Sequence, residues 1–307
     1  MVKRALGKTG YEISPVVFGG IINTGETQAD ANRYVAYAAE RGVNYFDVAP
    51  TYGDAEERLG EALLPYRKGI YLACKTTRRD AAGSREELEA SLKTLRTDYF
   101  DNYQLHSIRT VADVEEAFAP GGIVETIEAA KKEGIIRRAG ITVHSEENAL
   151  RCLEMYDFDT VLFPMNWALG VLYGFGDRIA EVVKKKNIGL LCMKVFAHRM
   201  WRDGETRPDG RKWYKHIAYR ETNGAATGGM CESTREGSNG AALALAAMKY
   251  ALAKGADALV PPGDFAAFCH MLEHIDEAIA FPYTPDDAAF LLAEAQKIKG
   301  YELELAQ

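Results

Sequence analysis

The chain has 307 residues, of which 47% are hydrophobic and 26% are charged, and its formal net charge is −7. Such a length suits one large domain with a buried core, and such a composition is ordinary for a globular protein. The acidic balance offers no broad basic surface for nucleic acid or for an anionic membrane, so we expect neither partner.

The first twenty residues lack the apolar stretch of a secretion signal. No later segment approaches the roughly 18 consecutive apolar residues that a membrane span needs. We therefore expect a cytoplasmic protein. The five cysteines are odd in number and widely spaced, which argues for buried free thiols and against a disulfide framework.

Short apolar runs alternate with amphipathic stretches along the chain, which is typical of strands and helices around a parallel sheet. We expect strands at residues 15–18, 44–48, 70–75, 100–106, 138–143, 160–164, 189–194 and 258–260. We expect helices at about residues 28–41, 56–63, 84–95, 123–133, 146–155, 177–186, 239–253 and 265–280. Eight alternations predict an α/β protein with a closed (β/α)8 barrel, formed as one domain over residues 1–307.

Several predicted helix ends have a local chemical reason. Ser84, followed by Glu87, can form a capping box at the start of the third helix. Lys131 and Lys132 suit the last turn of a helix that ends before Gly134, and the lysines at 184–186 end a later helix in the same way. Beyond residue 285, apolar residues at helical spacing predict an extra helix outside the barrel.

Residues 197–238, after the seventh predicted strand, break this alternation with glycine, proline and charge. Loops longer than about 15 residues without secondary structure are usually functional or disordered. Seven basic residues and three acidic ones lie between positions 198 and 220, with aromatic residues among them. We expect a lid with Trp201, Trp213 and Tyr214 as walls of a substrate pocket; a solvated loop packed on the barrel is the alternative.

Polar residues end three successive predicted strands. Asp47 ends the second strand and Tyr52 follows it by five residues, while Lys75 and His106 end the third and fourth strands. Each residue taken singly has an ordinary structural explanation. In a (β/α)8 barrel, however, the carboxyl ends of the strands hold the working residues, so we expect all four side chains in one pocket.

Together these four residues form a chemical unit. Reduction of a carbonyl by hydride transfer builds negative charge on oxygen, which requires a proton donor and hydrogen bonds to that oxygen. Tyr52 can donate the proton if the ammonium of Lys75 lowers the pKa of its hydroxyl, and Asp47 can neutralise that ammonium. His106 can bind and orient the substrate oxygen.

The chain resembles the aldo-keto reductases over nearly its whole length. The matching segments are RALGKTGYEISPVVFGG, NYFDVAPTYGDAEERLGEAL, YLACKTT, DYFDNYQLHS, GGIVETIEAAKKEGIIRRAGITVH and LLCMKVFA. The family's catalytic tetrad falls on Asp47, Tyr52, Lys75 and His106. The resemblance implies a (β/α)8 barrel that binds NADPH or NADH directly and acts on a small carbonyl or alcohol.

The resemblance also implies where the cofactor binds. In relatives, the turn after the first barrel strand and polar residues at the ends of later strands line its pocket. Leu162 stands where a glutamine is usual, and Met193 stands where an aromatic residue often covers the nicotinamide. The implied positions here are Gly19, Gly20, Thr142, His144, Asn166, Met193, Lys194, Pro262 and Gly263.

The choice between the two cofactors stays open. NADP-dependent relatives bind the 2′-phosphate through basic side chains after the last strand, since a phosphate dianion favours charge-assisted hydrogen bonds. Residues 259–274 contain no Lys or Arg, and they include Asp264. The amide groups that begin the helix at Phe265 remain as phosphate donors.

We therefore expect an NAD(P)H-dependent carbonyl reductase or alcohol dehydrogenase in which Tyr52 is the general acid or base. Two alternatives are a regulatory barrel that senses the cofactor and an enzyme that uses the nicotinamide transiently for elimination or epimerisation of a sugar-like substrate. We expect no metal site, because His270 and His274 share a helical spacing without an evident third ligand and read as helix-surface histidines.

Overall fold

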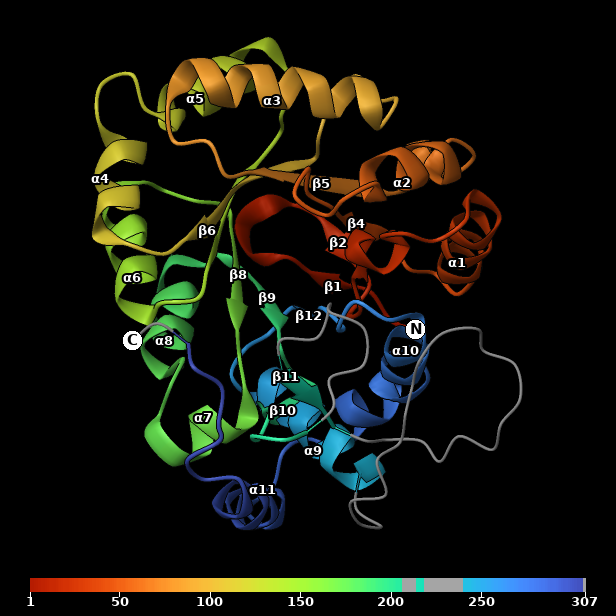
Figure 1. Cartoon of the computed structure of the whole chain (residues 1–307), viewed down its shortest axis with the longest axis vertical. Helices are drawn as coiled ribbons and strands as arrows, with labels where there is room; N and C mark the ends of the chain where they lie inside the picture. Colours follow the sequence, from red (N-terminus) through yellow and green to blue (C-terminus); the bar gives the residue numbers. More distant parts are fainter. Residues whose placement is uncertain (206–213, 218–239, 306–307) are drawn as a thin grey trace.

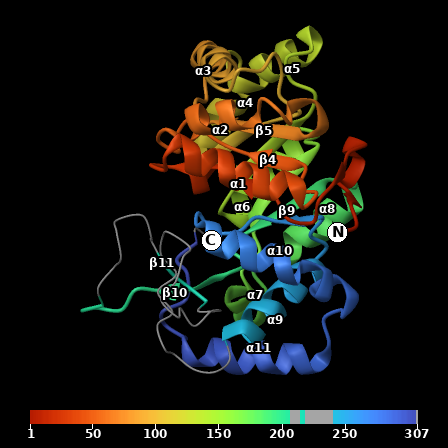
Figure 2. The same ribbon diagram turned by 90° about the vertical axis from the view of Figure 1, so that its right-hand side faces the viewer.

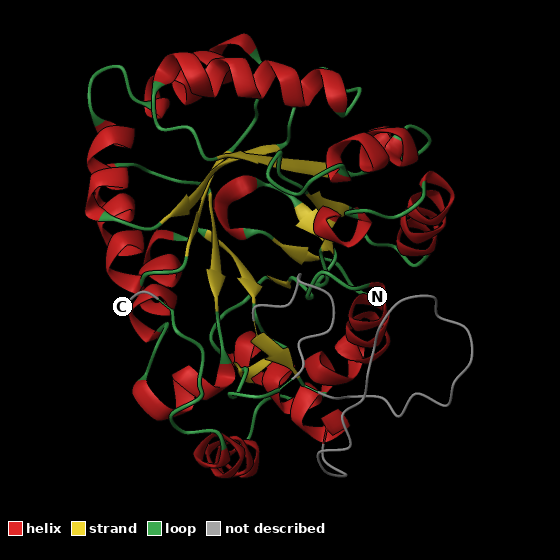
Figure 3. Cartoon of the chain, in the orientation of Figure 1, coloured by secondary structure: helices red, strands yellow, loops and turns green. Residues whose placement is uncertain are grey.

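The computed structural model describes residues 1–205, 214–217 and 240–305. Within them, parallel strands pair in chain order around a curved sheet (Figure 3). These strands are β3 (Phe18–Gly19), β4 (Tyr45–Asp47), β5 (Tyr71–Thr76), β6 (Asn102–Ile108), β7 (Ala139–Val143), β8 (Thr160–Pro164), β9 (Gly189–Met193) and β12 (Ala258–Leu259). All eight predicted strands are confirmed within a few residues.

The two ends of the sheet meet just before β3. Val16 forms a parallel bridge with Leu259 of β12. The amide of Val17 donates to the Leu259 carbonyl at 2.9 Å, and the Leu259 amide donates to the Pro15 carbonyl at 2.9 Å. The sheet therefore closes, and the predicted (β/α)8 barrel is confirmed.

Helices surround the barrel (Figure 1). The predicted ones are α1 (Gln28–Glu40), α2 (Ala55–Leu63), α3 (Ala81–Thr94), α5 (Ile123–Glu133), α6 (Glu146–Met155), α8 (Asp177–Lys186), α9 (Gly240–Ala253) and α10 (Phe265–Ala280). The extra helix is α11 (Pro285–Lys297), which packs against α9 and against α7 (Trp167–Tyr173). The sequence did not predict α7 or α4 (Val111–Phe118). Among the described residues, no helix combines the length and the apolar character that crossing a bilayer requires.

Helix ends follow local chemistry, with one correction. Gly134 ends α5 in the left-handed conformation at φ 78°, as its position after Lys131 and Lys132 predicts. The predicted capping box at Ser84 is wrong, because α3 begins three residues earlier. Asp80 caps it by accepting from the Gly83 amide at 2.7 Å, and Ser84 lies inside the first turns.

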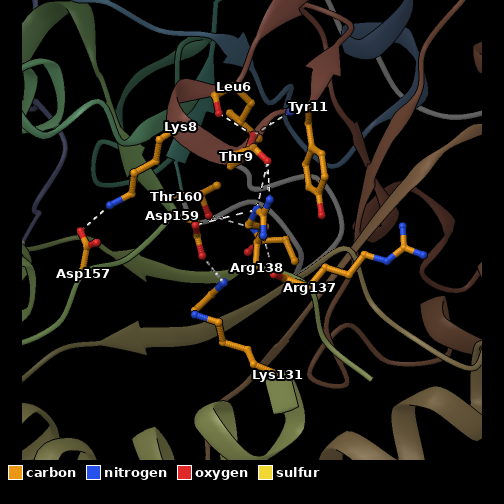
Figure 4. Close-up of polar contacts among 12 residues, drawn as sticks. Leu6, Lys8, Thr9, Tyr11, Lys131, Arg137, Arg138, Asp157, Asp159 and Thr160 are labelled. Atoms are coloured by element: carbon orange, nitrogen blue, oxygen red, sulfur yellow. Dashed lines mark hydrogen bonds and ion pairs between the residues drawn. The ribbon is translucent and has the colours of Figure 1, made fainter. Parts of the chain in front are cut away.

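An N-terminal hairpin covers the amino end of the barrel. It consists of β1 (Arg4–Ala5), the short 3-10 helix η1 (Gly7–Thr9) and β2 (Glu12–Ile13). The Arg138 guanidinium at the start of β7 donates to the Thr9 carbonyl at 2.8 and 3.0 Å (Figure 4). Tyr11 donates to the Asp101 carbonyl at 3.2 Å. This end is therefore closed by protein, so a ligand site belongs at the other end.

The segment after β9 contains a second hairpin, which the sequence did not predict. β10 (Ala197–Met200) pairs antiparallel with β11 (Tyr214–His216). Figure 2 shows this hairpin on the opposite side of the molecule from the N-terminus. It therefore lies at the carboxyl end of the barrel, where the predicted site is.

Candidate active site

The four polar residues at the carboxyl ends of the strands lie together. Asp47 ends β4, Lys75 lies near the end of β5, and His106 lies near the end of β6. Lys75 is completely buried, and its ammonium donates to the Asp47 carboxylate and, at 3.3 Å, to the Tyr52 hydroxyl. The Tyr52 and His106 rings are 5.7 Å apart at 87°. The side chains that the sequence places in one pocket thus contact one another.

Two further buried polar residues, Gln104 and Thr142, form a second row of hydrogen bonds that holds the Asp47 carboxylate in place. The Gln104 amide donates to Asp47 Oδ1 at 2.7 Å, and the Thr142 hydroxyl donates to Gln104 Oε1 at 3.3 Å. Gln104 was not predicted from the sequence. Its signal is that Asn102, Gln104 and His106 alternate along one strand and so face the same side of it. Thr142, expected beside the nicotinamide, is 3% exposed and belongs to this row.

The ammonium at the centre of the site stays charged. Burial is the largest influence on Lys75 and would lower its pKa, but the Asp47 carboxylate and the Tyr52 hydroxyl together raise that pKa above its usual value. For Tyr52, burial raises the pKa and Lys75 lowers it, with a net rise. Lys75 acts on the Tyr52 pKa in the expected direction, which is downward. The expectation of a lower pKa overall is wrong, because the effect of burial is larger than that of Lys75.

His106 is uncharged near neutral pH. Burial, with the positive charge of Lys75 as the next cause, lowers the pKa of its imidazole to about 2. The Thr51 hydroxyl lies 3.5 Å from its Nδ1. A neutral imidazole can hydrogen-bond an oxygen without adding a charge to the pocket.

His144 and Lys194, expected at the cofactor, lie just beyond β7 and β9. Burial, followed by the charges of Lys194 and Arg109, lowers the pKa of His144 to about 4. Lys194 has a positive φ of 60°, and its ammonium donates to the Tyr214 hydroxyl of β11 at 3.3 Å.

The Asn166 side chain is completely buried and engaged within the protein. It caps α7 by accepting from the Leu169 amide, and it donates to the Lys194 and Ala197 carbonyls at 3.3 and 2.9 Å. These contacts fix the start of the segment that follows β9. Asn166 therefore shapes that segment, and its expected contact with the cofactor stays a prediction.

The glycines at the mouth of the barrel have different surroundings. A Cβ on Gly20 would approach the Val48 side chain to 2.9 Å, and one on Gly263 would approach Ile21 to 3.1 Å. A Cβ on Gly19 would meet only ordinary van der Waals contacts at 3.8 Å. Gly20 is therefore needed for packing against β4. Met193 is the last residue of β9, and Pro262 follows the end of β12 by three residues.

Donor groups at this end fit a nicotinamide cofactor. Asn23 ends the 3-10 helix η2 (Gly20–Asn23) directly after β3, and its side chain is completely buried. Neither its amide nitrogen nor its amide oxygen has a hydrogen-bond partner among the described residues. A buried amide of this kind is costly unless it is satisfied, and a carboxamide or a phosphate could satisfy it. Asn23 was not predicted from the sequence, because a single asparagine in a turn has no distinctive pattern.

The start of α10 carries an acid where a phosphate would bind. Asp264 caps the helix by accepting from the Ala267 amide at 2.7 Å, and its other oxygen lies 3.6 Å from His216 of β11. This carboxylate occupies the positive end of the helix dipole, which is the feature that attracts phosphate.

The hairpin residues expected as pocket walls are partly described. Tyr214 contacts Lys194, and the Lys215 ammonium lies 5.6 Å from the Trp201 ring centre. Trp213 lies outside the described residues. Arg199 is 1% exposed and binds the Glu205 carboxylate through two bonds of 2.7 and 2.8 Å, and Lys215 binds it at 3.1 Å. These two cations therefore serve the hairpin itself.

The remaining candidates are structural. His270 is 3% exposed, so its expected place on the helix surface is wrong; its ring lies 4.2 Å from that of His274. The described part of the chain contains no group of three or more His, Cys, Asp or Glu residues that could hold a metal ion. The described cysteines, Cys74, Cys152, Cys192 and Cys269, are all buried, and none of them forms a disulfide with another of the four.

Comparison with known proteins agrees with this geometry. The chain is 35% identical over 156 residues to the oxidoreductase YqkF of Bacillus subtilis, covering 46% of this chain and 49% of that protein. It is 33% identical over 149 residues to the methylglyoxal reductase YeaE of Escherichia coli, covering 46% and 50%. The matched segments thus span about half the length of these relatives.

A solved structure and a family model extend over more of the chain. The aldo-keto reductase AKR11C1 of Bacillus halodurans has the same fold, with a TM-score of 0.68 and 21% identity, covering 99% of this chain and 98% of that one. The model of the aldo/keto reductase family matches residues 15–291. The chain therefore belongs to the aldo/keto reductase family of oxidoreductases.

Proposed function

We propose that this protein is an NAD(P)H-dependent oxidoreductase that interconverts a small carbonyl compound and its alcohol, with Tyr52 as the general acid or base. One observation carries the proposal. The ammonium of Lys75 is completely buried, yet it contacts both the Asp47 carboxylate and the Tyr52 hydroxyl. Burying an ion pair is costly, and a cation held against a phenol stabilises the phenolate that remains after a proton is given up.

The roles of the four residues follow from their surroundings. Tyr52 donates its hydroxyl proton to the carbonyl oxygen as negative charge develops there, and Lys75 stabilises the phenolate left behind. Asp47 keeps Lys75 charged, and Gln104 keeps Asp47 in place. His106 is neutral, so it acts by hydrogen-bonding and orienting the substrate oxygen.

The nicotinamide cofactor supplies the hydride when it is bound. The residues that we propose to hold it are the buried amide of Asn23, His144 and Lys194, together with the mouth of the barrel at Gly19, Gly20, Met193, Pro262 and Gly263. Asp264 at the start of α10 disfavours a phosphate dianion there, so NADPH would need a phosphate clamp elsewhere.

The substrate proposal is a small carbonyl compound. The E. coli relative is a methylglyoxal reductase, which makes methylglyoxal the first candidate. Sugar-derived aldehydes are the second, because Tyr214, Lys194 and Trp201 offer polar and aromatic groups on the same side of the barrel.

A side-by-side titration of the protein fluorescence with NADPH and NADH tests the cofactor proposal. The cofactor that binds more tightly is then used with methylglyoxal and a panel of aldoses, and its absorbance is followed. We expect net oxidation of the cofactor. Binding without turnover would favour a sensor, and product formation without net oxidation would favour transient use of the nicotinamide.

Replacing Tyr52 by Phe tests the proton donor. The variant keeps the ring but lacks the hydroxyl, so we expect turnover to fall by about 10²- to 10⁴-fold while the cofactor dissociation constant stays the same. Tyr173→Phe on α7 is the matched control, because its hydroxyl contacts Glu302 at the exposed surface. Equal turnover in Tyr52→Phe and wild type would contradict the role.

A further inference from the structure

The strand that carries His106 is irregular at that residue. Leu105 pairs with Ile141 of β7 and Ile108 pairs with Val143, so two residues of β6, His106 and Ser107, stand opposite one residue of β7. Ser107 has a φ of 57°, which is a strained conformation for a residue with a side chain. The bulge therefore places its extra residue, with this unusual backbone, directly after His106 at the end of the strand.

Arg79 supplies hydrogen bonds to this bulge. Its Nη2 donates to the His106 carbonyl at 2.7 Å and to the Ser107 carbonyl at 3.2 Å, and its Nη1 lies 3.5 Å from the Thr76 carbonyl. The residue is 7% exposed. The guanidinium therefore bonds the two carbonyls of the bulge, at the point where the regular pairing with β7 is interrupted.

Arg79 is itself held from two sides. Its Nε lies 3.5 Å from one oxygen of Asp113, and the other oxygen of Asp113 accepts from Thr110 in the capping box of α4. The Arg79 carbonyl accepts from the Ile123 amide at 2.7 Å, at the start of α5. The backbone of Arg79 is thus bonded to the start of α5, and its guanidinium lies between the Asp113 carboxylate of α4 and the bulge of β6.

We propose that Arg79 is a positioning residue that holds the bulge of β6 and thereby aims the His106 imidazole at the substrate oxygen. This inference rests on the proposed function, in which His106 orients the carbonyl. Small displacements of a positioning group are costly to catalysis, since about 1 Å can lower the rate by 10²-fold. A lysine could not replace Arg79, because it lacks the planar fork that reaches two carbonyls and a carboxylate at once.

The test compares Arg79→Met and Arg79→Lys with the control Arg78→Met. Arg78 is the next residue, its side chain is 62% exposed, and it pairs only loosely with Glu87 at 3.7 Å. The His106 imidazole signals are recorded by NMR and assigned by their loss in His106→Gln. The cofactor dissociation constant, kcat and KM are measured for each variant, alone and combined with His106→Gln.

We expect Arg79→Met to shift the His106 signals and to lower kcat by about 10- to 100-fold, with cofactor binding unchanged within about twofold. In the His106→Gln background the same substitution should have little further effect, because residues that act as a unit are not additive. For Arg79→Lys we expect a signal shift and a fall in kcat between those of wild type and Arg79→Met. Arg78→Met should have the signals and the kcat of wild type.

Other outcomes would overturn the proposal. Unshifted His106 signals in Arg79→Met would mean that Arg79 serves only the fold. The same conclusion would follow if Arg79→Met lowered kcat equally in the wild-type and the His106→Gln backgrounds. If Arg79→Met fails to fold, Arg79→Lys decides: wild-type signals and rate in that variant would refute positioning. If no carbonyl is reduced, the proposed function fails, but the NMR comparison still tests the contact between Arg79 and the His106 bulge.

Discussion

Two histidines at the carboxyl end of the barrel lie in surroundings that oppose their protonation. Burial is the main cause for both, and nearby cations add to it: Lys75 for His106, and Lys194 for His144. The pKa values fall to about 2 and about 4, compared with about 6.5 in an unfolded chain. Each histidine therefore enters the folded state uncharged.

This difference in pKa predicts a loss of stability in acid. Between pH 6.5 and the folded pKa, the unfolded chain binds more protons than the folded one, so the free energy of unfolding falls as the pH falls. We expect His144→Gln to remove the part of this loss that lies between about pH 6.5 and pH 4.

Urea unfolding at several pH values measures the difference between wild type and His144→Gln. The difference should be constant above about pH 7.5 and should change steadily from pH 6.5 to pH 4, with the variant losing less stability. A difference that stays constant over the whole range would show that His144 is not held uncharged.

Single residues of the site differ in how far the sequence predicts them. Asp47, Lys75 and His106 end apolar runs, so their convergence follows from the geometry of parallel strands. Gln104 could have been found from its alternation with His106 along one strand. Arg79 could not, because its contacts depend on a bulge and a positive φ at Ser107, which the sequence of β6 does not indicate.

At the scale of elements, β7 passes close to a cluster of polar side chains inside the barrel. Asn102 donates to the Tyr45 hydroxyl at 2.9 Å and to the Thr160 hydroxyl at 2.8 Å. Gly140 of β7 lies against this cluster, and a Cβ there would stand 2.3 Å from the Thr160 hydroxyl and 2.9 Å from Gln104 Cγ. The glycine is therefore needed for β6, β7 and β8 to approach one another.

We expect Gly140→Ala to destabilise the protein by about 1–3 kcal/mol through overpacking and to lower activity by displacing Gln104 from Asp47. Gly69→Ala, just before β5, is the matched control, because a Cβ there meets nothing within 4 Å. Urea unfolding gives the free energies and the carbonyl assay gives the rates. A Gly140→Ala variant as stable as Gly69→Ala would contradict this account of the barrel interior.

Elements with a clear period were predicted well, and short or wholly buried ones were not. The bounds of α5, α6, α8 and α10 agree with the sequence, since each has an apolar face and a recognisable end. α7 is apolar almost throughout, so its sequence lacks the alternation of apolar and polar faces that indicates a helix. The start of α3 was misplaced because Asp80 is as good a cap as Ser84 and lies earlier in the chain.

At the scale of the whole molecule, the alternation of strands and helices sufficed to predict the barrel. Closure between Val16 and Leu259 follows from eight strands, and the convergence of Asp47, Lys75 and His106 follows from closure. The segment after β9 was harder to predict. Its hairpin depends on contacts with distant parts of the chain, including a bond of 2.6 Å from the Met200 amide to the Tyr301 carbonyl.

The carboxylate of Glu205 ties this hairpin together. It binds the buried guanidinium of Arg199 on β10 and the ammonium of Lys215 on β11, and these cations hold its pKa well below the usual range together with the Arg202 amide. β11 in turn presents Tyr214 to Lys194. If the hairpin forms a wall of the substrate pocket, as the sequence predicts, loosening it should weaken substrate binding before it affects proton transfer.

Glu205→Gln tests this arrangement, since it keeps the size of the side chain and removes its charge. We expect the KM for the carbonyl substrate to rise by roughly fivefold, equivalent to about 1 kcal/mol, while kcat changes little. Glu61→Gln is the matched control, because Glu61 pairs with Arg96 at 3.4 Å on the exposed surface. Unchanged KM in a folded Glu205→Gln protein would mean that the hairpin stands apart from the bound substrate. A fall in kcat at unchanged KM would instead connect the hairpin to the Tyr52 site. A change in KM alone reports binding that is equal in the ground state and the transition state, whereas a change in kcat reports stabilisation of the transition state.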